Sequence, residues 1–184
     1  MSAFAPINQT DIQLFKPGNK LPHRVDHLWL ILNGVVKSYT VSEEGSQITL
    51  GFWGIEDLVG TSLSRITPYT LQCIDAVEAI ALHRNYWDSF SKNMLYNAQQ
   101  TQQLSYIVRS DRIAKRLWLL LQWLAIKFGR AIEEGTLIDF KLTHQELADA
   151  ISTTRITVTK TLIEFEAKGS ILRPRTKCII LKRS

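Results

Sequence analysis

The residues best suited to chemistry in this sequence form a short polar and basic run. Its members are Thr154, Arg155, Ile156, Thr157, Thr159 and Lys160. The run is followed by no acidic residue until Glu164, so a helix that begins at Arg155 would offer a surface suited to a polyanion. An arginine fork can bond guanine O6 and N7 in the major groove, and threonine and isoleucine methyl groups can pack on thymine. The run therefore predicts a base-reading surface centred on Arg155.

A second set of cations and hydrogen-bond donors flanks this run in the sequence. One group lies around a predicted basic turn and comprises Arg173, Arg175 and Lys177. The other begins a predicted short helix and comprises Thr143, His144 and Gln145. Such groups suit phosphate oxygens, which fix position and salt dependence without reading the sequence. We expect these residues to contact the DNA backbone, and a solvated basic surface is the alternative.

Two short helices must position these groups. Thr143 and Glu146 have the spacing of a capping box, which begins a helix that runs to about Ala150. Thr154 can cap a second helix, which Gly169 ends. Small and apolar residues occupy the inward positions of both helices: Leu147, Ala148, Ile151, Val158 and Leu162. This pattern predicts a helix-turn-helix, whose second helix enters the major groove.

The segments around this pair predict further elements of the same region. No Gly or Pro occurs between about Tyr86 and Arg116, which favours a long helix that ends near Ser110. A strongly apolar helix follows over 111–128, and it is too short to span a bilayer. We expect an alternating strand over 138–142 and two strands around the basic turn over 171–181.

The first 90 residues have the pattern of short strands separated by turns. Asn33-Gly34 is a tight-turn signal within the branched and aromatic segment 28–41, and Glu43 to Ser46 form a second turn. A strand over about 69–82 follows Pro68. Turn residues at such intervals predict an antiparallel sandwich or barrel.

The charge is unevenly distributed between these regions. The 184 residues carry a formal charge of +5. Residues 1–110 hold 8 Lys and Arg against 9 Asp and Glu, a net −1, and residues 111–184 hold 14 against 8, a net +6. Cys73 and Cys178 are far apart, which excludes a disulfide scaffold and a zinc ribbon and fits a reducing cytoplasm. The start of the chain lacks the pattern of a secretory signal.

The order of these elements and the run from Thr143 to Lys160 resemble the Crp/Fnr transcription regulators. Segment 154–160 is most similar to the global nitrogen regulator branch, where an aliphatic residue, here Ile156, replaces the acid that follows the recognition arginine. The turn position that is often glycine in the family is Ser152, where we expect a negative φ.

This resemblance implies an α+β protein of three parts. Residues 1–90 would form an N-terminal antiparallel β-roll similar to cyclic-nucleotide-binding domains. Residues 91–110 would form a dimerisation helix, and 111–184 a C-terminal winged helix-turn-helix. The resemblance further implies a cytoplasmic homodimer on a near-palindromic double-stranded DNA site, with RNA polymerase as a partner and no role at a membrane.

The family's roll binds a small effector, and the sequence predicts against cyclic AMP. That nucleotide needs a Glu soon after the last glycine and an Arg-Ser or Arg-Thr pair, whereas Thr61 follows Gly60 and Pro68 occupies the place of the pair. The nitrogen regulator branch binds 2-oxoglutarate with the help of arginines. Arg109 is the candidate here, and an exposed surface arginine is the alternative interpretation of that residue.

Two other classes of protein compete with this interpretation. A cupin-like metalloenzyme would share the roll, but it needs clustered histidines, and His23, His27, His83 and His144 are scattered. We therefore predict no metal site, no catalytic residue and no enzymatic activity. A non-DNA-binding interaction protein is the other alternative, and Arg155 and the basic turn argue against it.

Overall fold

The structure is a computed structural model that describes residues 12–174 and 178–182. The chain divides into two compact units. The first comprises residues 1–41 and 50–101, and the second comprises 42–49 and 102–184. The division falls between Thr101 and Gln102, within a single helix.

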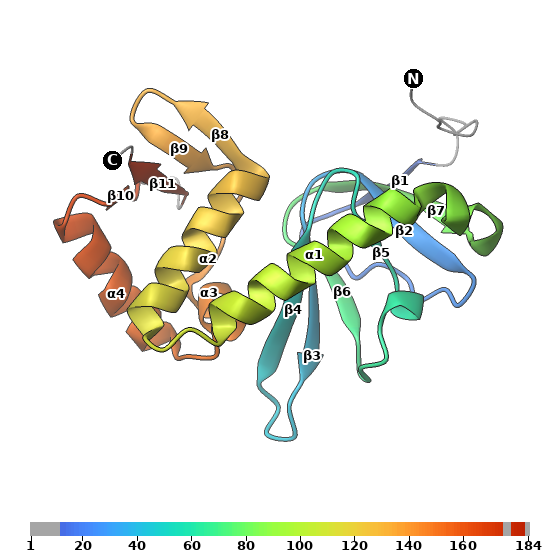
Figure 1. The fold of residues 1–184 in the computed structure, drawn as a ribbon, viewed down its shortest axis with the longest axis horizontal. Coiled ribbons are helices and arrows are strands. Elements are labelled where there is room, and N and C mark those ends of the chain that lie inside the picture. The colour runs from blue at the N-terminus through green and yellow to red at the C-terminus, as the bar shows by residue number, and fades with distance from the viewer. Residues whose placement is uncertain (1–11, 175–177, 183–184) are drawn as a thin grey trace. The chain divides into compact units, whose positions relative to one another are not determined.

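The first unit is built on two sheets (Figure 1). Its strands are β1 (Ile12–Phe15), β2 (His27–Asn33), β3 (Val36–Val41), β4 (Gln47–Trp53), β5 (Leu58–Val59), β6 (Thr70–Cys73) and β7 (Val77–His83). One sheet has the order β1-β7-β2-β5 and the other β4-β3-β6. Strands β1, β2, β5 and β7 pair antiparallel, as do β3 and β6, as the sequence predicts. Buried aromatic and branched side chains fill the interior, among them Trp29, Ile31 and Leu71.

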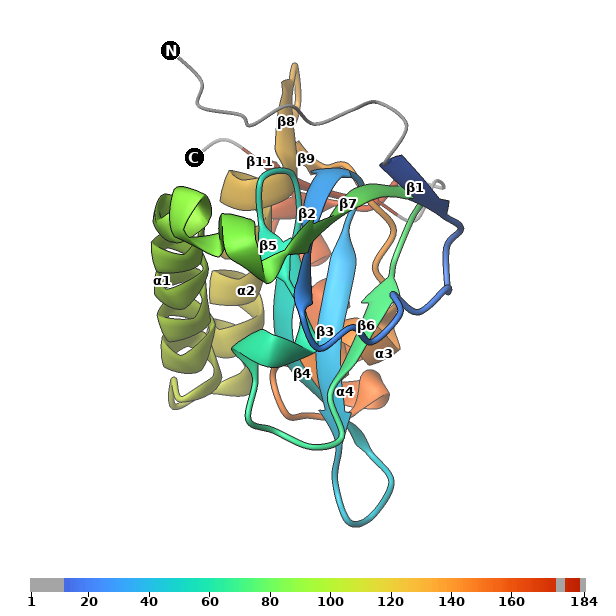
Figure 2. The same cartoon turned by 90° about the vertical axis from the view of Figure 1, so that its right-hand side faces the viewer.

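The turn at Asn33-Gly34 forms, but it does not close a hairpin, because β2 and β3 lie in different sheets. Gly34 has φ +86°, and a Cβ atom there would lie 2.1 Å from the carbonyl oxygen of Ala76. The next residue, Val35, donates its amide hydrogen to Asp75 Oδ1 at 2.7 Å. The second predicted turn, Glu43 to Ser46, does close a hairpin, because it joins the neighbouring strands β3 and β4 (Figure 2).

The single strand predicted over 69–82 is wrong, since the structure has two strands there. Strand β6 pairs with β3, and β7 pairs with β2 in the other sheet. The chain changes sheets at 74–76, opposite the crossing at Gly34, and the amide of Ile74 donates to Val35 O at 2.8 Å. An uninterrupted strand could not supply both sheets.

A long helix follows the roll. A 3-10 turn over Arg84–Phe90 leads into α1 (Ser91–Val108), so the predicted helix is confirmed but becomes α-helical only at residue 91. One face of α1 is buried, and it includes two polar residues, Asn97 and Gln100, beside the apolar Leu104 and Ile107. The opposite face exposes Leu95 and Tyr106, and the partly exposed Tyr96 borders the buried face. The break expected near Ser110 is present, because α2 (Ile113–Phe128) begins after it.

The second unit packs three helices with one sheet (Figure 1). After α2 come β8 (Gly129–Ile132), β9 (Gly135–Ile138), α3 (His144–Ala150), α4 (Arg155–Ala167), β10 (Ile171–Leu172) and β11 (Ile179–Lys182). The sheet order is β10-β11-β9-β8. Two neighbouring rings, Trp118 of α2 and Phe165 of α4, pack edge to face with centroids 5.5 Å apart.

The strand predicted over 138–142 is misplaced, and β8 was not predicted. Strand β9 ends at Ile138, where the alternating pattern begins. Phe140 and Leu142 are buried although they lie outside any strand, so their alternation with polar residues reflects burial alone. The hairpin partner β8 starts directly at Gly129, the residue expected only to end α2.

Candidate nucleic-acid interface

Both predicted helix caps are present. At the start of α3 the amide of Glu146 donates to Thr143 Oγ1 at 3.1 Å, and the amide of Thr143 donates to Glu146 Oε2 at 2.8 Å. At the start of α4 the amide of Thr157 donates to Thr154 Oγ1 at 3.2 Å. Each cap satisfies amides that have no partner within the helix, and so fixes the residue at which the helix begins.

The turn between these helices differs from the expectation in one respect. Ser152 has φ +55°, which is the left-handed region, so the predicted negative φ is wrong. The turn is closed around it by the amide of Thr153, which donates to Ala148 O at 3.0 Å. Arg116 of α2 also donates to Ile151 O at 3.3 Å. These bonds fix a short connection that requires the left-handed backbone.

The inward positions of the helix pair are confirmed. Five side chains are fully buried: Leu147, Ala148, Ile151, Val158 and Leu162. The small Ala148 allows the backbones to approach, and its carbonyl oxygen accepts the turn bond from Thr153. The buried face of α4 therefore fixes which of its residues face solvent.

The outward face of α4 carries the predicted base-reading residues. Thr154, Arg155, Ile156 and Lys160 are exposed or partly exposed, while Thr157 and Thr159 are partly buried. The side chain of Ile156 is 68% exposed, which is unusual for a large apolar residue. Ile163 is 52% exposed on the same face, seven residues further on, and was not predicted. Its helical spacing from Ile156 is the signal that could have identified it.

His144 lies against α4. Its Nδ1 atom is 2.7 Å from Thr159 Oγ1, and that hydroxyl donates to Arg155 O at 2.9 Å. The single Thr159 hydrogen is thereby used, so His144 Nδ1 carries the hydrogen of this contact. Burial, followed by the charges of Arg173 and Arg155, lowers the pKa of His144. The imidazole thus stays neutral and supports the helix that carries Arg155.

The predicted phosphate contacts are found in different local settings. Gln145 donates to Asp149 Oδ1 at 2.7 Å on the exposed side of α3. Arg173 donates from Nε and Nη2 to Glu166 Oε2 at 3.0 and 2.6 Å, so the wing is tied to the end of α4. Arg175 and Lys177 lie outside the described residues.

One concavity of the second unit brings most of these residues together. It has a volume of about 690 Å³, and its lining includes Thr143, His144, Gln145, Arg155 and Arg173. Residues that are distant in the sequence, from the start of α3, the start of α4 and the wing, therefore surround one recess. Its basic and hydrogen-bonding groups suit an acidic backbone.

The roll has a cavity of its own, with a volume of about 420 Å³. Its lining is mostly apolar, with the hydroxyls of Ser38, Tyr69 and Thr101 and one cation, Arg65, among the described residues. Burial raises the pKa of Tyr69, so its phenol remains protonated. Arg109 follows the end of α1 and is not among the residues that line this cavity.

Comparisons with known proteins agree with this geometry. A family model described as the Crp-like helix-turn-helix domain matches residues 111–184. The regulatory protein CysR of Synechococcus elongatus is 36% identical over 165 residues, which cover 88% of this chain and 79% of that protein. The chain belongs to the Crp/Fnr family. This regulator is also 30% identical to the global nitrogen regulator of Nostoc sp. over 202 residues, which cover 98% and 87% of the two chains.

A solved structure extends the comparison to the fold of the Crp/Fnr regulators. A Crp-family transcriptional regulator of Thermus thermophilus superposes with a TM-score of 0.80 at 19% identity, covering 93% of this chain and 92% of that one. The predicted β-roll and C-terminal helix-turn-helix are thus confirmed. This Crp/Fnr protein is a DNA-binding transcription regulator, and its relatives are regulators rather than enzymes. Within the described part of the chain, no helix is long and apolar enough to cross a membrane.

Proposed function

We propose that the exposed face of α4 reads a specific DNA sequence in the major groove, with Arg155 as the main base contact. The supporting observation is the state of its side chain. Arg155 is exposed at the first position of a capped helix, and no hydrogen bond or ion pair with a described residue engages its guanidinium. An unpaired fork at the start of a recognition helix is available to guanine.

The neighbouring residues divide between bases and phosphates. Thr159 and Lys160, about one turn further along α4, are proposed to contact bases beside Arg155. Ile156 and Thr157 offer methyl groups to thymine. Thr143, Gln145 and Arg173 border the same concavity and are proposed to contact the sugar-phosphate backbone. Arg175 and Lys177 are proposed for the same role from their place in the sequence.

Selection of bound DNA from a randomised pool tests this assignment. We expect Arg155→Ala to weaken specific binding by roughly 1–3 kcal/mol and to relax the preference at one base pair. Arg130→Ala is the matched control, because Arg130 is an exposed arginine of the same unit that pairs with Asp139. An unchanged sequence preference in Arg155→Ala would show that the assigned role is wrong.

We further propose that the regulator acts in the cytoplasm as a homodimer joined along α1. The exposed Leu95 and Tyr106 form an apolar stripe opposite the buried face of this helix. A two-fold dimer would place two recognition helices about 34 Å apart and would favour a near-palindromic site. Sedimentation of Tyr106→Glu against Tyr86→Glu, an exposed tyrosine that precedes α1, tests this helix. RNA polymerase is the proposed partner at the promoter.

The roll cavity is the proposed effector site, and 2-oxoglutarate is the first ligand to test. Its support is the position of Arg65, which offers a carboxylate a charge-assisted partner at a cavity of small-molecule size. The roll lacks the acidic residue for the ribose and the Arg-Ser or Arg-Thr pair for the phosphate that cyclic AMP would need. Calorimetry with both compounds, on the wild type and on Arg65→Gln, separates these ligands. Tight cyclic AMP binding would contradict the proposal.

A further inference from the structure

A second, smaller cavity of the roll is unusually cationic. It has a volume of about 150 Å³, and its lining includes Lys20, Arg24, His23 and His27. No acidic residue is among the described residues that line it. This absence is notable, because residues 1–110 as a whole carry a net charge of −1. The nearest acid in the sequence, Asp26, forms an ion pair with Arg84 at 3.5 Å instead.

The aromatic ring of Trp29 holds the principal cation in place. The Arg24 guanidinium carbon lies 5.1 Å from the centroid of this ring, a cation–π arrangement. Trp29 is itself fixed, since it is 1% exposed and its Nε1 atom donates to Pro22 O at 3.0 Å. Stacking leaves the edge of an arginine free to donate hydrogen bonds in its plane. No hydrogen bond or ion pair with a described residue occupies those donors.

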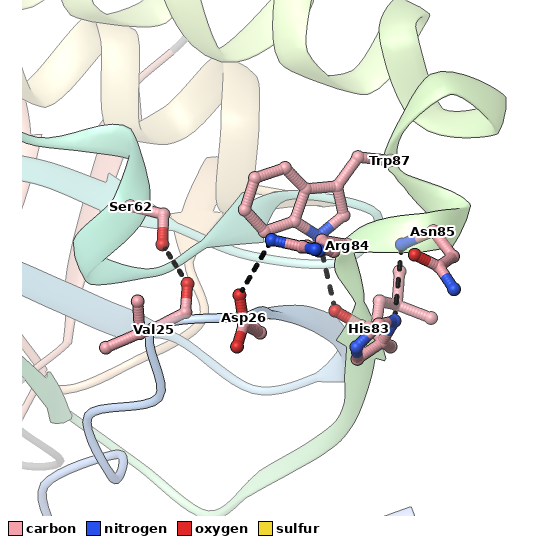
Figure 3. Close-up of polar contacts among 8 residues, drawn as sticks. Val25, Asp26, Ser62, His83, Arg84, Asn85 and Trp87 are labelled. Carbon is pink, nitrogen blue, oxygen red and sulfur yellow. Dashed lines mark hydrogen bonds and ion pairs between the residues drawn. The ribbon is translucent and has the colours of Figure 1, made fainter.

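The loop that carries these cations is fastened at both ends. At its start the amide of Leu21 donates to Leu71 O at 3.0 Å. Near its end Ser62 Oγ donates to Val25 O at 2.6 Å, and Asp26 meets Arg84, as Figure 3 shows. The amide of Arg84 also donates to Asp26 O at 2.8 Å. The cost of ordering a binding loop has thus been met in the folded protein.

One wall residue of the cavity has an unused polar group. Thr61 Oγ1 is buried and has no hydrogen-bond partner among the described residues. Buried hydroxyls are rarely left without a partner, and a bound group often explains the exceptions. A hydroxyl hydrogen with no acceptor is suited to an oxygen atom that carries negative charge.

We propose that this cavity binds a small multivalent oxyanion of the phosphate and sulfate type. Two cations, the N–H groups of two imidazoles and the Thr61 hydroxyl would supply the donors. The volume equals about five water molecules, which suits a tetrahedral anion. It is well below the roughly 300–1,000 Å³ of pockets for larger ligands, which favours a small anion over a nucleotide. The site adjoins the larger cavity, with which it shares Tyr69, but its cations are different ones and it does not depend on the effector proposed there.

Calorimetry of the full chain with sodium sulfate and sodium phosphate tests the site, with ionic strength held constant by sodium nitrate. We expect saturable binding of one anion per chain. Arg24→Gln should weaken it on the order of tenfold or more, and Lys20→Gln by less, because Arg24 is the held cation. Arg130→Gln is the matched control, since it removes the same charge from an exposed arginine that pairs with Asp139 in the second unit and lines neither roll cavity.

The Trp29 indole N–H resonance provides a second readout of the same event. It should shift with the midpoint found by calorimetry, and Trp29→Phe identifies its peak. Saturation by either anion supports the proposal, and the two midpoints show which anion the site favours. Non-saturating shifts would overturn it, as would binding that Arg130→Gln abolishes and Arg24→Gln leaves unchanged.

Discussion

Replacing Ser152 with glycine should stabilise the helix-turn-helix. The residue has φ +55°, and its hydroxyl makes no hydrogen bond with the described residues. Its side chain is exposed, so the substitution leaves no cavity. The backbone is therefore the principal part of the molecule that the change affects.

The magnitude follows from two opposing terms. A residue with a Cβ atom in the left-handed region costs about 1–2 kcal/mol, which glycine does not incur. Glycine in turn loses more backbone entropy on folding, by about 0.4–1 kcal/mol. We expect Ser152→Gly to raise the free energy of unfolding of the second unit by about 0.5–1 kcal/mol, the difference between these two terms. That change corresponds to roughly 2–8 °C in Tm for a unit of this size.

The chain offers a reciprocal and a matched control for this experiment. Gly169 has φ +70°, and a Cβ atom added there would meet nothing within 4 Å. Gly169→Ala should therefore destabilise the same unit by about 1 kcal/mol through the backbone alone. Ser170 is not among the residues with positive φ, so Ser170→Gly should destabilise rather than stabilise.

Urea unfolding followed by tryptophan fluorescence, with hydrogen exchange of the α4 amides as a local probe, measures these changes. The midpoint of Ser152→Gly should rise with an unchanged slope. A midpoint equal to or below that of the wild type, together with a loss in Gly169→Ala, would refute the assignment of backbone cost to Ser152.

Three further predictions concern the second unit and the thiols. The pKa of His144 lies below its ordinary 6.5, so the unfolded chain binds a proton that the folded chain does not. The free energy of unfolding should therefore fall as the pH drops from about 6.5 towards the pKa of the folded state. In His144→Gln this loss should be smaller. Urea midpoints measured above and below that pH range test both expectations. Glu166→Gln releases Arg173 from its pair and should steepen the salt dependence of DNA binding by up to about one unit of log–log slope; an unchanged slope in gel shifts would count against Arg173 as a phosphate contact. Burial, followed by Asp75, raises the pKa of Cys73 to about 11, so a disulfide reagent in mildly alkaline buffer should modify the partly exposed Cys178 first, and Cys178→Ser should remove the fast phase.

The features that the sequence predicted well depend on local chemistry. The caps at Thr143 and Thr154 are hydrogen bonds across three residues, and residue type and spacing are sufficient to place them. The inward positions of α3 and α4 follow from helical periodicity in the same way. The face that carries Arg155 is therefore predictable from the sequence alone.

The features that it missed depend on partners distant along the chain. Asn33-Gly34 has the composition of a hairpin turn, yet β2 pairs with β7 and β3 with β6, segments about 30–55 residues away. Arg173 has the pattern of a free cation, but Glu166, seven residues earlier at the end of α4, pairs with it once the chain has turned into β10. The left-handed backbone of Ser152 is imposed by bonds to Ala148 and Arg116, and its residue type gives no sign of it. The cationic cavity likewise combines Lys20 and Thr61, which no local pattern connects.

The crossing at Gly34 also constrains how the roll can form during synthesis. Strand β2 leaves the ribosome long before β7, the strand with which it forms most of its pairs, for example Trp29 with Ala81. At about 5–20 residues per second, the intervening 50 or so residues take roughly 3–10 s to appear. In that interval the apolar run Leu28–Ile31 has only the two-residue β5 as a native partner, and Asn33-Gly34 favours a hairpin between β2 and β3 that the native roll does not contain. Folding of the roll must therefore avoid this hairpin, or dissolve it wherever it forms first.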